Sequence, residues 1–103
     1  LVERATDFGF DQAGVSNRFV TPNGDGKNDT VVFSYDNPRD VSVRARILDL
    51  RGRVVVSELP QGPVTNSRVW DGRGAGVPVP SGVYLYQLEA EGRVYSGSIV
   101  ILK

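Results

Sequence analysis

Cysteine, histidine and methionine are all absent from this chain of 103 residues. Without cysteine there is no disulfide bond, so a folded domain must depend on its core, although the absence does not decide the cellular compartment. Without histidine the chain lacks the usual proton shuttle near neutral pH and the commonest transition-metal ligand. Because the chain begins at Leu1 and not at methionine, we expect a fragment, a processed protein or an excised domain.

The chain also has no excess of charge of either sign and no long apolar run. Twelve basic residues balance twelve acidic ones, which argues against nucleic acid or an anionic membrane surface as the main partner. No apolar stretch approaches the ~20 residues of a transmembrane helix. The apolar content of 40% is that of an ordinary soluble domain, and the length suits a single one.

The apolar residues that are present recur with a period of two. Alternation over 31–36 and 41–47 predicts half-buried strands, and Gly52 followed by 54–56 makes 41–56 a hairpin. Residues 67–70 read as a short strand that carries the only tryptophan. A final hairpin turns at Glu91-Gly92.

These strands predict an all-β protein. No ten-residue stretch has helical spacing, whereas the many short strands and turns favour an immunoglobulin-like antiparallel β-sandwich of about seven strands. The segment 71–82, with four glycines and two prolines, is expected to be an irregular connection. The valines and the following residues are expected to form the core: Phe33, Trp70, Tyr84, Tyr86 and Leu88.

An acidic loop, "TPNGDGKND" at 21–29, precedes the strand that begins near residue 31. Its alternate positions offer the oxygen atoms of Asn23, Asp25, Lys27 (through its carbonyl group) and Asp29, which are the ligands that Ca²⁺ prefers. Asn-Gly and Asp-Gly are equally typical of an ordinary β-turn whose carboxylates bond to backbone N–H groups. Any further calcium ligand would come from elsewhere, and three aspartates are candidates by charge: Asp11, Asp36 and Asp71.

Three stretches in this order resemble a known group of bacterial domains: "RFVTPNGDGKND", "ILDLRGRVV" and "WDGRGAGVPVPSGVYLYQLEAEGRVYSGSIVILK". Together they are similar to the immunoglobulin-like C-terminal domains of proteins exported by the type IX secretion system, and also to the related domain of the flagellar hook-capping protein. The resemblance covers roughly 17–103 and leaves 1–16 as an N-terminal strand or the remnant of a linker. The chain departs from the Pro-Asn-Pro-Phe type of motif of many relatives at 22–25.

The resemblance implies a non-catalytic C-terminal module that directs type IX secretion of a larger protein and attaches it to the cell surface. The implied partners are the outer-membrane secretion machinery and N-terminal catalytic or binding domains of the same chain, and the implied location is secreted or cell-surface. With this resemblance, the calcium interpretation of 21–29 becomes the favoured one, in a structural role. Sorting contacts are expected on the last hairpin, at Arg93, Tyr95, Ile99, Ile101 and Lys103.

Two other functions remain open from the sequence. A carbohydrate- or cell-wall-binding module appended to a hydrolase would use exposed Trp70 beside Asp71 as a stacking platform, although a tryptophan at a strand end more often fills the core. A spacer or assembly domain would use the face of Arg44 and Arg46. We find no nucleophile with a base and therefore expect no enzyme, while Tyr84 or Tyr86 is expected to bond through its hydroxyl to a nearby loop.

Overall fold

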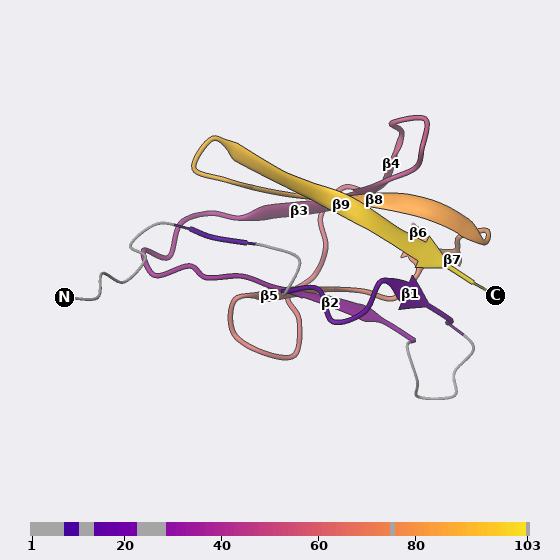
Figure 1. Ribbon diagram of the computed structural model, residues 1–103, viewed down its shortest axis with the longest axis horizontal. Coiled ribbons are helices and arrows are strands. Elements are labelled where there is room, and N and C mark those ends of the chain that lie inside the picture. Colours follow the sequence, from indigo (N-terminus) through magenta and orange to yellow (C-terminus); the bar gives the residue numbers. More distant parts are fainter. Residues whose placement is uncertain (1–7, 11–13, 23–28, 75, 103) are drawn as a thin grey trace.

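The computed structural model describes residues 8–10, 14–22, 29–74 and 76–102 (Figure 1). Over these residues the chain forms strands and no α-helix, which confirms the predicted all-β class. The strands are β1 (Phe19–Val20), β2 (Val31–Ser34), β3 (Arg44–Leu48), β4 (Val54–Val56), β5 (Ser67–Trp70), β6 (Arg73–Gly74), β7 (Val77–Pro78), β8 (Gly82–Ala90) and β9 (Arg93–Ile101). Their number is nine rather than about seven, because the two-residue strands β6 and β7 form a ladder inside 71–82, where we expected an irregular connection.

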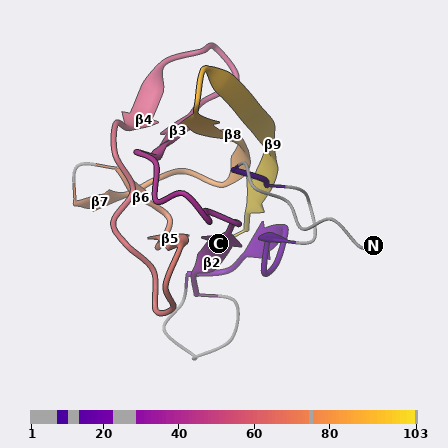
Figure 2. The same ribbon diagram turned by 90° about the vertical axis from the view of Figure 1, so that its left-hand side faces the viewer.

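The strands form two layers, as a sandwich requires. One layer is a five-stranded sheet in the order β1-β9-β8-β3-β4, and the other is the pair β2-β5 (Figures 1 and 2). Along β3 and β8 of the larger sheet, buried side chains alternate with more exposed ones, so that one face covers the core and the other faces solvent. The predicted sandwich is confirmed.

One pair departs from the predicted antiparallel arrangement: β1 runs parallel to β9, with Phe19 opposite Val100 and Val20 opposite Ile101. A parallel pair cannot be joined by a tight turn. Here almost the whole domain separates β1 from β9 in sequence, so no turn is needed. Two backbone hydrogen bonds hold the pair, from Val100 N to Arg18 O (2.8 Å) and from Leu102 N to Val20 O (2.9 Å).

The two predicted hairpins are both present. β8 and β9 pair over their full length around Glu91 and Gly92, whose φ angles of 53° and 74° are those of a type I′ turn. β3 pairs with β4 through a turn that Asp49 organises, since its Oδ1 accepts hydrogen bonds from the backbone N of Arg51 and of Arg53, each at 2.9 Å. The backbone hydrogen bond from Arg53 is the main reason that the pKa of the Asp49 carboxyl lies below its ordinary value.

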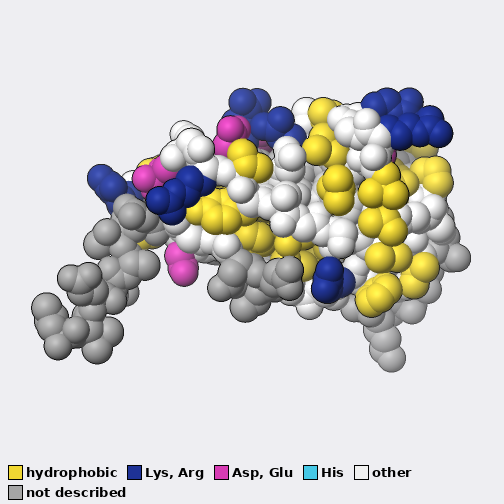
Figure 3. Space-filling model, turned by 45° about the horizontal axis from the view of Figure 1, so that its top comes forward, with side chains coloured by type: hydrophobic (Ala, Val, Ile, Leu, Met, Phe, Trp, Pro, Cys, Tyr) yellow, Lys and Arg dark blue, Asp and Glu magenta, His cyan; other side chains and the backbone are white. Residues whose placement is uncertain are grey.

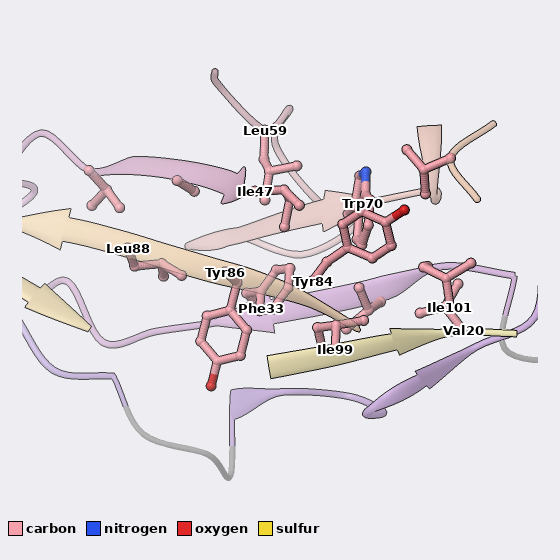
Figure 4. Close-up of a cluster of buried hydrophobic side chains, with 14 of the residues drawn as sticks. Val20, Phe33, Ile47, Leu59, Trp70, Tyr84, Tyr86, Leu88, Ile99 and Ile101 are labelled. Atoms are coloured by element: carbon pink, nitrogen blue, oxygen red, sulfur yellow. The ribbon is translucent and has the colours of Figure 1, made fainter. Parts of the chain in front are cut away.

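The core lies between the two layers (Figure 4). All five predicted core residues are buried, with Phe33 and Leu88 fully inaccessible and Trp70 only 2% exposed. A buried side chain of this size contributes about 1.5–3 kcal/mol relative to an exposed one. Four further large residues are completely buried: Ile47, Leu59, Ile99 and Ile101.

The described parts of the first sixteen residues pack on this sandwich. Phe8 is 4% exposed, and its ring lies 5.2 Å from that of Tyr35 and 5.6 Å from that of Tyr95. Isolated bridges join Gly9 to Asp36 and Val15 to Phe33. The division between 1–16 and 17–103 stays a prediction, while the contacts give Phe8 a place in the core.

Tyr84 makes the predicted bond from a core tyrosine to a loop. Its ring is buried and its hydroxyl donates to the carbonyl of Pro80 at 2.7 Å. Burial raises the pKa of Tyr84 above its ordinary value of 10.0, and the negative charge of Asp49 raises it further. Burial also raises the pKa of Tyr86, against a smaller lowering by Arg18.

These shifts predict how stability depends on alkaline pH. The folded state resists ionisation of Tyr84 more than the unfolded state does. The contribution of Tyr84 to the free energy of unfolding is therefore intact below pH 10.0 and falls as the pH rises above it. Tyr84→Phe should make this fall shallower without abolishing it, because Tyr86 still titrates, and should cost about 1 kcal/mol at neutral pH for the lost hydrogen bond. Denaturant unfolding between neutral and alkaline pH measures both effects. An identical pH dependence in the two chains would contradict the assignment to Tyr84.

Candidate functional surface

The acidic loop, 21–29, precedes β2 in the sequence. Asn23, Asp25 and Lys27 of the predicted calcium site lie outside the described residues, and Asp29 is described at the end of the loop. Pro22, where the loop begins, packs on Gly72, since a Cβ at Gly72 would lie 3.4 Å from Pro22 Cγ. The metal site is therefore still a prediction, but the surroundings of both ends of its loop are known.

Those surroundings rank the further aspartates that the sequence left unranked. Val31 is paired with Trp70, so Asp71 lies at the loop end of β2, next to Gly72. Asp36 bridges to Gly9 beyond the other end of β2, and Asp11 is outside the described residues. Asp71 is thus the aspartate placed toward the loop, and one of its oxygens accepts a hydrogen bond from Arg73 N at 3.1 Å. Within the described parts of the chain, no group of three or more acidic, histidine or cysteine side chains could hold a metal ion.

The four described residues expected to make sorting contacts all lie on the same, inward face of β9 and differ in how deeply they are buried. Arg93 is exposed and Tyr95 is half-buried, whereas Ile99 and Ile101 are completely buried (Figure 4). In a strand, side chains two positions apart share a face, so the alternation that places Tyr95 against the aromatic cluster also turns Ile99 and Ile101 inward. These two isoleucines cannot contact a partner while the domain is folded, so the expectation of direct sorting contacts at Ile99 and Ile101 was wrong. Lys103 lies outside the described residues, and the sorting role of this segment stays a prediction.

The opposite face of β9 carries the side chains that a partner can reach: Val94, Ser96, Ser98 and Val100. The sequence reasoning named the odd-numbered residues of this strand and missed the even-numbered ones. The same period of two, anchored on a buried isoleucine, could have found them.

Trp70 belongs to the core and is not a stacking platform for sugars. Its indole Nε1 donates to the carbonyl of Arg73 at 3.0 Å, and its ring meets that of Tyr84 edge-on at 5.6 Å. Because the ring is 2% exposed, no sugar can stack on it in the folded domain. The carbohydrate-binding alternative therefore loses the residue on which it depended.

A polar cleft of about 510 Å³ opens near the start of β3, on the side of β5. Two of its side chains are occupied in holding the fold together. The two terminal nitrogens of the Arg68 guanidinium group donate hydrogen bonds, Nη2 to Val43 O and Nη1 to Leu59 O at 2.8 Å each, and Nη1 also to Glu58 Oε1 at 3.2 Å. Asn37 uses its amide group to bond to both backbone groups of Val41. Among the described residues that line the cleft, no nucleophile is paired with a base.

The arginine face considered for assembly is present on β3, but its ion pair contributes little to stability. Arg44 and Arg46 point outward from β3, and Arg46 lies 3.4 Å from Glu89 on β8. An ion pair of this exposure contributes about 0–1 kcal/mol.

In the described part of the chain, no helix is long or apolar enough to cross a membrane.

Comparisons with known proteins agree with this architecture. Residues 13–101 match the protein family described as the CHU_C type IX secretion signal domain. A solved structure of PorZ from Porphyromonas gingivalis, described as an essential bacterial surface component of the type IX secretion system, is similar with a TM-score of 0.60 and 22% sequence identity. The similarity covers 86% of this chain and 11% of the PorZ chain, so the present chain corresponds to a small part of PorZ, and at this identity it shows the fold alone. No curated protein matches the chain.

Proposed function

The chain belongs to the type IX secretion signal domain family, and we propose that it is the C-terminal sorting module of a larger protein that this system exports and attaches to the cell surface. The observation that carries the proposal is the family match, which extends over 13–101 and so includes every strand of both layers. A folded sandwich suits this role, because a sorting signal needs a rigid recognition surface and no catalytic groups. The cargo is the part of the protein that precedes this domain.

Recognition by outer-membrane components of the export apparatus would use side chains of β9 that solvent can reach. Arg93 is exposed, and Tyr95 is half-buried beside it at the start of β9, so both remain proposed contacts. The buried isoleucines of the same strand would act indirectly, by holding β9 in the sheet. We place the exported protein outside the cell or on its surface, in keeping with the family.

A transplant experiment tests the sorting role. The chain is fused to the C-terminus of a reporter that already reaches the periplasm, in a bacterium with a working type IX secretion system. We expect the reporter to appear in the medium or on the cell surface, and to stay in the periplasm in the same strain without the system. A fusion that lacks 93–103 should also stay in the periplasm. Equal export with and without the secretion system would contradict the proposal.

We also propose that Ca²⁺ binds the loop at 21–29 in a structural role. The support is the alternation of oxygen-bearing residues in the sequence, together with Asp71, which the pairing of Val31 with Trp70 places at the same end of β2. A bound cation would offset the mutual repulsion of Asp25 and Asp29 and would tie the loop to the sandwich. The ion would stabilise the domain and would take no part in a reaction.

Calcium addition and removal test this second proposal. Ca²⁺ at about 100 times its dissociation constant should stabilise the folded chain by about 2.7 kcal/mol, and a chelator should reverse the effect. Asp25→Ser/Asp29→Ser should abolish the calcium response. Asp36→Ser, which lies beyond the far end of β2, should keep it. A melting temperature that ignores both calcium and chelator would refute the site.

A further inference from the structure

The outer face of the five-stranded sheet is divided into an apolar half and a polar half. The strand register aligns Phe19, Val100 and Val83 across β1, β9 and β8, and it aligns Leu85, Leu48 and Val54 across β8, β3 and β4. These six residues define the apolar half. The rows toward the other end of the sheet form the polar half, in which Val94 is the one aliphatic side chain: Ser96, Gln87 and Arg46, followed by Val94, Glu89 and Arg44.

Three of the six side chains of the apolar half are exposed, and the other three, Leu48, Leu85 and Val100, are partly buried. Phe19 and Val54 are each 55% exposed and Val83 is 39% exposed, and the patch is extended by Leu102 after β9 and by Leu50 in the turn after β3. Apolar side chains gather at one end of the face that Figure 3 shows. Isolated exposed apolar residues are normal on a protein surface, but a contiguous patch usually marks an interaction site.

The charges around the apolar half are mostly positive. The segments that carry it, 18–20, 48–54, 82–85 and 98–102, contain four charged residues: Arg18, Asp49, Arg51 and Arg53. Asp49 is occupied by its own turn, because it accepts from two backbone N–H groups and lies 3.1 Å from Arg53 Nε. Arg18 is exposed, with Nη2 at 3.5 Å from Ser98 Oγ, and Arg51 is exposed at the other edge of the sheet. The patch therefore presents apolar side chains between two arginines.

We propose that the apolar half, with Arg18 and Arg51 at its edges, is the docking surface for a different protein chain that has an apolar patch bordered by carboxylates. This inference rests on the proposed sorting function, so the expected partner is a component of the export apparatus. Apolar burial would provide most of the affinity, while the two guanidinium groups would fix the orientation through carboxylate pairs.

Charge argues against two other occupants of this surface, an anionic membrane and a second copy of the chain. An anionic membrane is usually bound by about four to eight clustered basic residues, whereas this patch has three, one of them paired with Asp49. A second copy in a two-fold dimer would bring the same surface against itself. Its arginines would then meet no unoccupied carboxylate, because Asp49 is the one acidic residue of these segments.

The reporter fusion described above tests the surface with matched variants. Phe19→Ser/Val54→Ser/Val83→Ser should lower export by about tenfold or more, as the loss of a binding hot spot does, and Arg18→Glu/Arg51→Glu should lower it to a similar extent. Val64→Ser/Val77→Ser is the control, since these valines are 55% and 63% exposed but lie outside the five-stranded sheet. Arg44→Glu, on the polar half, is the control for charge. Melting temperatures of the purified chains show that each variant is folded.

The outcomes separate this inference from the sorting function. If the unmodified fusion is exported and both patch variants are exported equally well, the docking surface is wrong and the sorting function stands. If the unmodified fusion stays in the periplasm, the sorting function and the docking surface are both refuted. Restored export of Arg18→Glu/Arg51→Glu by carboxylate-to-lysine changes in a secretion component would support the inference directly. Sedimentation with phosphatidylglycerol vesicles, or self-association, that is lost in the patch variants would overturn it in favour of a membrane or a second copy.

Discussion

Trp70→Ala is expected to lower the free energy of unfolding by about 3–5 kcal/mol, as the truncation of a buried aromatic residue generally does. The indole fills the space between the two layers, where its ring meets Tyr84 and its Nε1 donates to Arg73 O. Alanine removes the ring, leaves a cavity and leaves that carbonyl without its donor. For a domain of this size the melting temperature should fall by about 15–30 °C, which thermal unfolding followed by circular dichroism measures.

Two further variants keep this prediction testable if the alanine chain does not fold. Trp70→Phe retains most of the packing and loses the hydrogen bond, so it should cost less than alanine, about 1–2 kcal/mol. Val77→Ala, at a position 63% exposed on β7, should change stability by less than about 0.5 kcal/mol. A Trp70→Ala chain that melts close to the unmodified one would contradict the core assignment and would reopen the sugar-stacking role.

Local pattern was enough to predict the strands that have one face in the core. The period of two located β2 and β3, in which buried side chains alternate with more exposed ones, and the turn chemistry of Glu91-Gly92 located the hairpin of β8 and β9. Trp70 was correctly assigned to the core because a large ring at the end of a short strand has few other places to go in a small sandwich. These are properties that a segment carries by itself.

The features that were missed depend on segments far apart in the sequence. β1 has two residues, and its parallel pairing with β9 is set by the whole sandwich rather than by any local pattern. Phe8 lies in the first sixteen residues, for which the sequence indicated no core role, and its burial follows from the rings of Tyr35 and Tyr95. The apolar half of the outer face is likewise invisible in a single strand, because it exists only where the register aligns Phe19, Val83 and Val54 with their neighbours.

Gly97 is another residue whose structural role could not be predicted from the sequence. It faces the core from β9, directly opposite Tyr86 on β8, and the Tyr86 ring covers it. A Cβ at this position would come within 2.7 Å of Tyr86 Cε2 and closer still to the hydroxyl end of the ring. The φ angle of Gly97 is not positive, so space rather than backbone conformation requires glycine here.

Gly97→Val is therefore expected to cost about 3 kcal/mol, at the upper end of what overpacking usually costs. To admit the valine, Tyr86 must leave its place beside Phe33 and Phe10, whose rings lie 4.9 and 5.8 Å away. In a Tyr86→Ala background the same substitution should cost little, because the space is empty and valine suits a strand, which makes the coupling energy about 2–3 kcal/mol. Ser96→Val, which points outward from the same strand, should change stability by less than about 0.5 kcal/mol. Denaturant unfolding of the four chains of this cycle measures the coupling, and an equal cost of Gly97→Val in both backgrounds would mean that Tyr86 is not the obstacle.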